Sequence, residues 1–193
     1  VYLLANAQYS SMLYTIQYQN AIVQHTITPF GSTLEGAQHN VWYEPGDGSS
    51  VFGDLYPGAL KQLFDIIEKT KNNPARSNLY NMARIWKAYC FQVLVDTYGD
   101  VPYSEAGKAV TSGIFLPEYD NQETIYDDLL KEVSEATAAL NTSQVIAEKN
   151  ELFYAGDIAK WKKLGNSLLL RLAMRYSKVN ASKAQQYAAI AAN

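Results

Sequence analysis

The sequence predicts an all-α protein made of antiparallel helical pairs with long loops between them. Apolar residues recur at three- and four-residue spacing over residues 77–98, 122–140 and 158–178, which is the spacing of one face of a helix. No segment alternates apolar and polar residues over the length of a strand. Glycine and proline gather between the helical segments, where they mark turns and loops.

Before the central helix, the sequence predicts two helices and a long loop. Residues 2–24 form the first helix, and Thr28-Pro29 ends it because the residue before a proline is pushed out of helical geometry. Residues 26–53 are rich in glycine and also carry aromatic side chains. Loops of this length are usually functional or disordered, and the aromatic residues favour the first of these.

The second helix covers residues 54–71, with Pro57 in its first turn, where a proline is tolerated. The central helix, residues 77–98, carries the longest apolar stripe and ends at Tyr98 or Gly99, since glycine accepts the positive φ of a helix end. A second long loop follows over residues 99–121.

The remaining helices have recognisable starts. Asp120-x-x-Glu123 resembles a capping box for the helix over residues 122–140, and Asp157 is the expected N-cap of residues 158–178. Ser182 begins a similar box before an alanine-rich final helix.

Composition excludes several classes of protein. The chain has 193 residues, which fits one domain, and is 48% apolar and 18% charged with a net charge of −3, so no basic nucleic-acid-binding surface is expected. Cys90 is the single cysteine, which rules out a disulfide framework within the chain. No apolar run is long enough to span a membrane. The 15 tyrosines against 6 phenylalanines favour half-exposed positions at interfaces and binding surfaces.

A weak repeat signal appears in the second half of the chain. Trp161-x-x-Leu164-Gly165-x-x-Leu168 nearly matches the opening of a tetratricopeptide repeat, with Leu168 in place of a tyrosine. Gly165 would let a partner helix approach closely. The sequence therefore predicts divergent tetratricopeptide-like pairs separated by long insertions.

Two longer signatures identify a family. The first runs Ala88-Tyr-x-Phe-x-x-Leu-Val-Asp-Thr-Tyr-Gly-Asp-Val-Pro-Tyr-Ser-Glu-Ala106, and the second Trp161-x-x-Leu-Gly-Asn-Ser-Leu-x-Leu-Arg-Leu-Ala-Met-Arg175. Together they resemble the SusD/RagB family of nutrient-binding outer-membrane lipoproteins. The resemblance covers residues 1–193 and corresponds to the N-terminal helical, tetratricopeptide-like part of a member, with the C-terminal part missing.

The resemblance implies a location and a function. Family members of this Bacteroidetes-type transport system are held on the outer face of the bacterial outer membrane by a lipidated N-terminal cysteine. They bind glycans or other nutrients without cleaving them and deliver them to a SusC-like TonB-dependent transporter. The anchoring cysteine is not in this chain, and Cys90 lies within a helical stripe, without the small residues of a lipidation site.

The predicted binding site lies in the first long loop. Sugars present flat C–H faces to aromatic rings and hydroxyl groups to amides, carboxylates and imidazoles. We therefore expect a glycan to bind one cluster of residues, which comprises Gln38, His39, Asn40, Trp42, Tyr43 and Glu44. A structural alternative is that Trp42 only fixes the loop to the core. Tyr103, Phe115 and Tyr119 in the second loop are secondary candidates.

No catalytic residue, metal ligand or cofactor site is predicted. His25 and His39 are the only histidines, and no metal, phosphate-loop or nucleophile-elbow motif is present. Two alternatives to glycan delivery stay open: a tetratricopeptide-type protein–protein interaction scaffold that binds no sugar, and a hydrolase whose active site lies in the missing half.

Two polar groupings are expected to be structural. We expect Arg171 and Arg175 to pair with acids of the neighbouring helix, such as Glu132 or Glu135, rather than to bind a ligand. The acidic face of residues 123–135 is expected to be solvated surface. Asp96 and Asp100 are expected to fix the turn at Gly99 through hydrogen bonds.

Overall fold

A computed structural model describes residues 2–11, 50–144 and 148–192. The predicted all-α fold is confirmed, and the only strands among these residues form one two-residue pair. The helices are α1 (Tyr2–Ser10), α4 (Ser50–Asp54), a π-helical segment (Leu55–Leu60), α5 (Lys61–Thr70), a 3₁₀ turn (Pro74–Arg76), α6 (Ser77–Tyr98), α7 (Ala109–Ser112), α8 (Gln122–Ala139), α9 (Ile158–Arg175) and α10 (Ala181–Ala191). The strands are β1 (Val101–Pro102) and β2 (Tyr119–Asp120).

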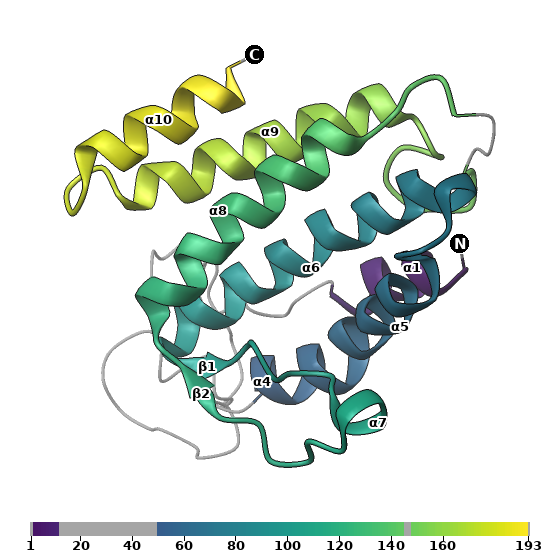
Figure 1. The fold of residues 1–193 in the computed structure, drawn as a ribbon, viewed down its shortest axis with the longest axis horizontal. Coiled ribbons are helices and arrows are strands. Elements are labelled where there is room, and N and C mark those ends of the chain that lie inside the picture. Colours follow the sequence, from purple (N-terminus) through teal and green to yellow (C-terminus); the bar gives the residue numbers. More distant parts are fainter. Residues whose placement is uncertain (1, 12–49, 145–147, 193) are drawn as a thin grey trace, which may run out of the picture.

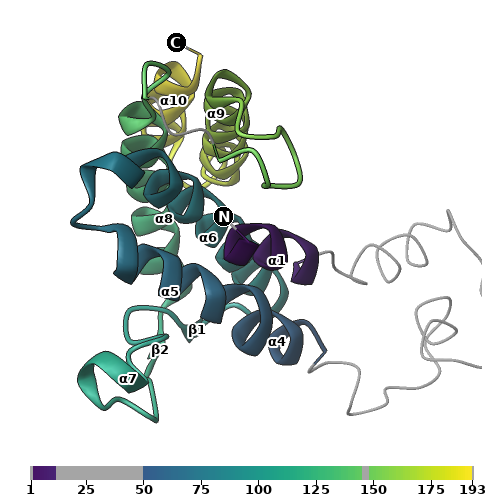
Figure 2. The same cartoon turned by 90° about the vertical axis from the view of Figure 1, so that its right-hand side faces the viewer.

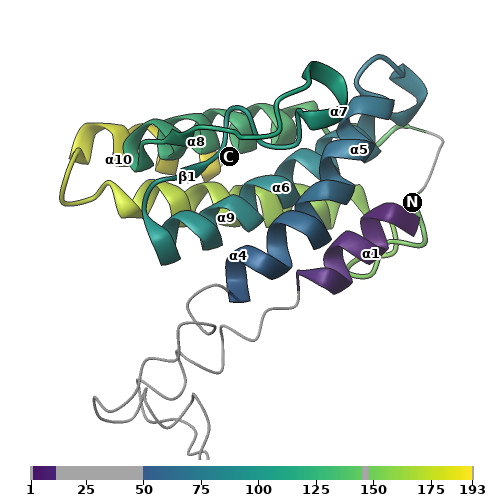
Figure 3. The ribbon, with the colours of Figure 1, turned by 90° about the horizontal axis from the view of Figure 1, so that it is seen from below.

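Helix α6 lies at the centre of the molecule. Figure 1 shows α6, α8, α9 and α10 side by side, each antiparallel to the next in the chain. Helices α1, α4 and α5 cover the opposite side of α6, as Figures 2 and 3 show. The predicted antiparallel packing of the three long helices on one core is therefore confirmed.

The core follows the apolar stripes of the sequence. Met82, Phe91 and Leu94 of α6 are fully buried, as is Trp161 of α9, while Trp86 keeps 9% of its surface exposed. Cys90 is a free thiol inside this core, and burial raises its pKa well above the usual range. It therefore packs as a small apolar side chain.

Two glycines act as the sequence predicts. Gly99 ends α6 with a φ of 78°, and its N–H donates to the carbonyl of Val95. Gly165 lies where α9 meets α8, and a Cβ added there would lie 2.0 Å from Thr137 Oγ1. The absence of a side chain at Gly165 therefore permits the close contact between these helices.

The boundaries of the first two helices differ from the prediction. Helix α1 ends at Ser10, and residues 12–24 of the first predicted helix lie outside the described part of the chain. The second helical stretch begins at Ser50, so Pro57 lies inside the π-helical segment and not in a first turn. Proline has no N–H to donate and its ring clashes with the carbonyl four residues earlier, and π-type turns are one of the local irregularities that interrupt an α-helix.

The predicted caps are correct at one helix and shifted at two. Asp157 caps α9, and its carboxylate accepts from Lys160 N at 3.1 Å. Asn121, not Asp120, caps α8, and Asn180, not Ser182, caps α10. An asparagine side chain accepts the same hydrogen bond, so sequence alone did not distinguish neighbouring candidates. Among the described helices, none has the length and apolar character needed to cross a bilayer.

Candidate functional site

The main predicted site lies outside the described residues. Residues 12–49 include the whole cluster of Gln38, His39, Asn40, Trp42, Tyr43 and Glu44. Its role in ligand binding therefore stays a prediction. The structure does describe the second loop, with the three secondary candidates.

This second loop is fixed to the helices at several points. Its two ends meet in the β1–β2 pair, in which Val101 faces Asp120. The Asp120 carboxylate accepts from Tyr103 N at 2.9 Å and from Ser104 N at 2.8 Å. These bonds lower the pKa of Asp120 even though burial raises it. The sequence predicts no strand here, because a two-residue strand has no detectable period.

The middle of the loop is also held in place. Gly107 has a φ of 75°, and a Cβ there would lie 2.4 Å from Cδ2 of Phe64 on α5. The Glu105 carboxylate accepts from Glu118 N at 3.0 Å across the loop. The loop therefore presents its exposed side chains from an ordered backbone.

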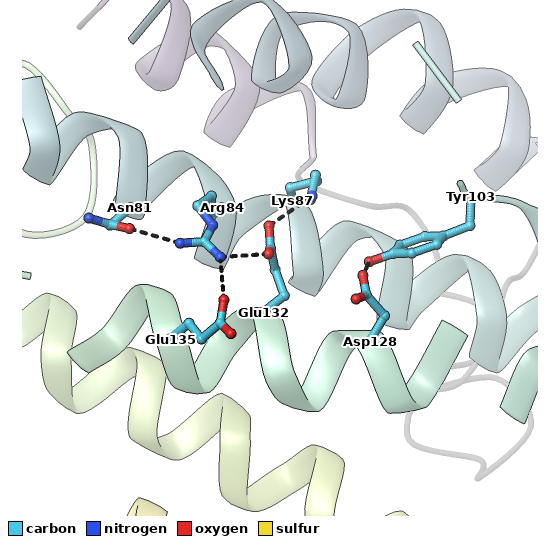
Figure 4. Close-up of polar contacts among 7 residues, drawn as sticks. All are labelled: Asn81, Arg84, Lys87, Tyr103, Asp128, Glu132 and Glu135. Atoms are coloured by element: carbon cyan, nitrogen blue, oxygen red, sulfur yellow. Dashed lines mark hydrogen bonds and ion pairs between the residues drawn. The ribbon is translucent and has the colours of Figure 1, made fainter. Parts of the chain in front are cut away.

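Tyr103 is the most enclosed of the three secondary candidates. Its ring lies edge-on to Phe91, with centroids 4.6 Å apart, and its hydroxyl donates to Asp128 of α8 (Figure 4). Burial raises the pKa of Tyr103, and the hydrogen bond to the Asp128 carboxylate adds to the effect. Tyr103 thus joins the loop to α6 and α8.

Phe115 and Tyr119 point to solvent. Phe115 is 78% exposed and Tyr119 is 67% exposed. Val110 and Leu116 lie on the same loop with 98% and 91% exposure. We call these four residues the 110–119 surface. The loop therefore offers two rings for stacking, while Tyr103 is held by the helices.

A charged seam joins α6 to α8 (Figure 4). Arg84 donates to Glu132 at 2.8 Å and Glu135 at 3.2 Å, and Lys87 pairs with Glu132 at 2.9 Å. Arg84, Lys87 and Glu132 expose only 13%, 16% and 15% of their side chains. Burial would raise the pKa of Glu132, but Arg84 and Lys87 outweigh it and the net shift is downward. The expectation of a solvated acidic face on α8 is wrong at Glu132.

The expected partners of Arg175 are also wrong. Arg84 occupies the acids of α8, and Arg175 instead pairs with Asp96 of α6 at 2.5 Å. Asp96 also accepts from the hydroxyl of Tyr126, so it ties α6 to α8 and α9 and does not fix the Gly99 turn. Asp100 likewise accepts from Gln122 N at 2.8 Å. Helix-to-helix partners such as these depend on tertiary packing, and sequence spacing gives no signal for them.

No metal site emerges from the geometry of the described residues, since no three side chains of the ligating types gather there.

Comparison with known proteins identifies relatives over the whole chain. A family model described as "Starch-binding associating with outer membrane" matches residues 1–193. A solved chitin-binding protein is 37% identical, with a TM-score of 0.81, over 97% of this chain and 39% of its own. A Bacteroidetes AC2a SusD-like protein is 30% identical, with a TM-score of 0.80, over 99% of this chain and 36% of its own.

A chitin-binding SusD homologue from Flavobacterium johnsoniae is also similar, with 27% identity and a TM-score of 0.63 over 72% of this chain and 30% of its own. A search of curated proteins found no match. The chain spans 39% and 36% of the first two solved relatives, so it corresponds to one part of proteins of that size. The family model covers every residue, and the two signatures of the sequence lie on α6 with the start of the loop that follows it, and on α9. The chain therefore belongs to the SusD-like family.

Proposed function

We propose that the complete protein binds a glycan at the surface of the bacterial outer membrane, does not cleave it, and passes it to a SusC-like TonB-dependent transporter. The match of all 193 residues to the SusD-like family model carries this proposal, because that family is described as starch-binding and associated with the outer membrane. In this proposal a lipid anchor outside these residues holds the protein at the surface.

Chitin and starch fragments are the first ligands to consider. Two solved relatives are called chitin-binding, at 37% and 27% identity, and the family description names starch. Both polymers are uncharged, since starch is a plain glucan and the amino groups of chitin are acetylated. The net charge of −3 gives this chain no general attraction for anionic ligands.

The loop that contains Trp42 is the proposed main contact, and Phe115 and Tyr119 are a second one. An indole or phenol ring stacks on a sugar face while amide and carboxylate groups bind its hydroxyls. The exposure of Phe115 and Tyr119 on an anchored loop supports the second contact. A loop whose backbone is already held in place loses little backbone entropy on binding.

The expected affinity is low. A stacked ring and a few solvent-competed hydrogen bonds contribute about 1 kcal/mol each. Four or five of them give about −4 to −5 kcal/mol, a dissociation constant of roughly one millimolar or slightly less. Weak binding suits a protein that must release its ligand to a transporter.

Calorimetry on the complete protein tests this function, with maltohexaose and chitohexaose as probes. Trp42→Ala is expected to remove most of the affinity and leave the helical circular-dichroism signal unchanged. Tyr9→Ala is the matched control, since Tyr9 is 68% exposed on α1, away from both loops in the sequence. If binding survives in Trp42→Ala and is lost in Phe115→Ala or Tyr119→Ala, the main contact lies on the 110–119 surface. Release of shorter sugars would support a hydrolase instead.

The 110–119 surface also supports a second candidate, a protein-binding scaffold. Val110 and Leu116 are aliphatic and almost fully exposed, and clustered exposed apolar side chains are typical of protein contacts. If this is the main function, Val110→Ser with Leu116→Ser would abolish co-purification with the transporter, and no glycan in the panel would bind. Glycan binding that is unchanged in this double variant would contradict it.

A further inference from the structure

A pocket that none of the predicted sites includes lies where α6 and α9 end and α8 begins. Its volume is about 330 Å³, which lies at the small end of the usual range for ligand pockets, roughly 300–1,000 Å³. It is lined by Asp96, Gln122, Glu123, Tyr126, Arg175, Tyr176 and Val179. All of these residues lie in the described part of the chain, on three helices and the turn after α9.

Two fixed tyrosine rings form part of its lining. The rings of Tyr126 and Tyr176 lie edge to face, with centroids 6.2 Å apart. Tyr126 donates its hydroxyl to Asp96, and Tyr176 donates to Asp127. Each tyrosine is only 6% exposed, so the rings shape the pocket and do not move to fill it.

Both hydrogen-bond donors and hydrogen-bond acceptors line the rest of the pocket. Arg175 pairs with Asp96 at 2.5 Å while 54% of its side chain stays exposed, which leaves other guanidinium N–H groups open to a ligand. Gln122 and Glu123 lie in the first turn of α8 and bond through their backbone N–H groups to Asp100 and Asn121. Within the described residues, the Gln122 amide and the Glu123 carboxylate have no hydrogen-bond partner.

This combination suits a neutral polyol. A sugar hydroxyl donates one hydrogen bond and accepts others, so it can bind the Glu123 carboxylate and the Arg175 or Gln122 N–H groups together. Asp96 and Glu123 carry two negative charges against one positive charge on Arg175, which disfavours an anionic ligand. The volume limits the ligand to a unit of about monosaccharide size.

We propose that this pocket is a second glycan subsite that binds one neutral sugar unit, with Gln122, Glu123 and Arg175 as its hydrogen-bonding groups. The proposal rests on the proposed glycan-binding function and adds a site to it. Arg175 also has a structural partner in Asp96, whereas Gln122 and Glu123 are exposed and their side chains support no other element. Substitutions at Gln122 and Glu123 therefore test ligand binding without loosening the helix contacts.

The experiment measures affinity for chitohexaose and maltohexaose by calorimetry, with the complete protein and three variants. Glu123→Gln removes the charged acceptor, and Gln122→Ala removes the neighbouring amide, which is exposed in the first turn of α8. Glu135→Gln is the matched control, because it makes the same charge change at a 52% exposed position of the same helix. Helix geometry puts these two acids roughly 18 Å apart along the axis.

The proposal expects an affinity about threefold to tenfold weaker in Glu123→Gln and Gln122→Ala, as for the weakening or loss of one hydrogen bond, and an unchanged affinity in Glu135→Gln. Melting curves should shift by only a few degrees, because Glu123→Gln removes a carboxylate from the first turn of α8 and Glu135→Gln removes an exposed ion pair with Arg84. Wild-type affinity in both pocket variants would overturn the subsite and leave the proposed function standing. If neither glycan binds the wild-type protein, the glycan-binding function itself fails for these ligands, and the subsite with it.

Discussion

Gly165→Ala should show how closely α8 and α9 approach each other. The added Cβ would lie 2.0 Å from Thr137 Oγ1, 2.9 Å from its Cγ2 and 3.0 Å from its Cβ. Rotation of the Thr137 side chain does not relieve all three contacts, because its Cβ does not move in that rotation. The helices must therefore shift apart, and strain of this kind costs about 1–3 kcal/mol or more.

Helix propensity acts in the opposite direction. Alanine is favoured over glycine in a helix interior by about 0.8–1 kcal/mol. Because the backbone at position 165 is helical, this gain applies in full. A 2.0 Å contact is far inside van der Waals distance, so we expect the strain to dominate and the variant to lose about 1–2 kcal/mol of unfolding free energy overall.

A double-mutant cycle with Thr137→Ala separates the two effects. Thr137 Oγ1 is buried without a hydrogen-bond partner in the described structure, so its removal alone should cost little. In the double variant only the 3.0 Å contact between Cβ atoms remains, and most of the lost stability should return. Urea unfolding followed by circular dichroism measures all four proteins. A Gly165→Ala variant more stable than the wild type by about 1 kcal/mol would refute the close approach. It would show the gain in helix propensity with no steric strain between α8 and α9.

Further substitutions test the core and the α1 contact. Trp161→Ala and Trp86→Ala should each cost about 3–5 kcal/mol, because both indoles lie in the core; a loss below about 1 kcal/mol in denaturant titrations would contradict this. Glu151→Gln should cost about 1–3 kcal/mol near neutral pH, because this buried carboxylate accepts from Gln8 Nε2 and from three backbone N–H groups. Burial raises the pKa of Glu151, but these bonds outweigh it and lower the pKa. The stabilisation is therefore full above the unfolded pKa of about 4.3 and is lost as the pH falls through the lower folded value. A cost of Glu151→Gln that does not shrink toward about pH 3 would exclude this linkage.

The sequence by itself determined the helices and the family. The apolar stripe of α6 and its end at Gly99 depend on residues a few positions apart, so both can be recognised from the sequence alone. The close approach at Gly165 was also predictable, because a conformational role for glycine follows from its missing side chain. The caps were less certain, since Asp120 and Asn121 lie one residue apart and both carry a side-chain oxygen that can accept the N-cap hydrogen bond.

Tertiary structure alone decided which side chains meet across helices. Arg84 rather than Arg175 pairs with Glu132, and Arg175 pairs with Asp96, because the rotation of each helix about its axis sets which charges face each other. The contacts of Tyr103, a secondary candidate for ligand binding, are another example, since its ring packs on Phe91 of α6 and its hydroxyl donates to Asp128 of α8. The pocket between three helix ends arises in the same way. Its residues lie far apart in the sequence, and only the packing of α6, α8 and α9 brings them together.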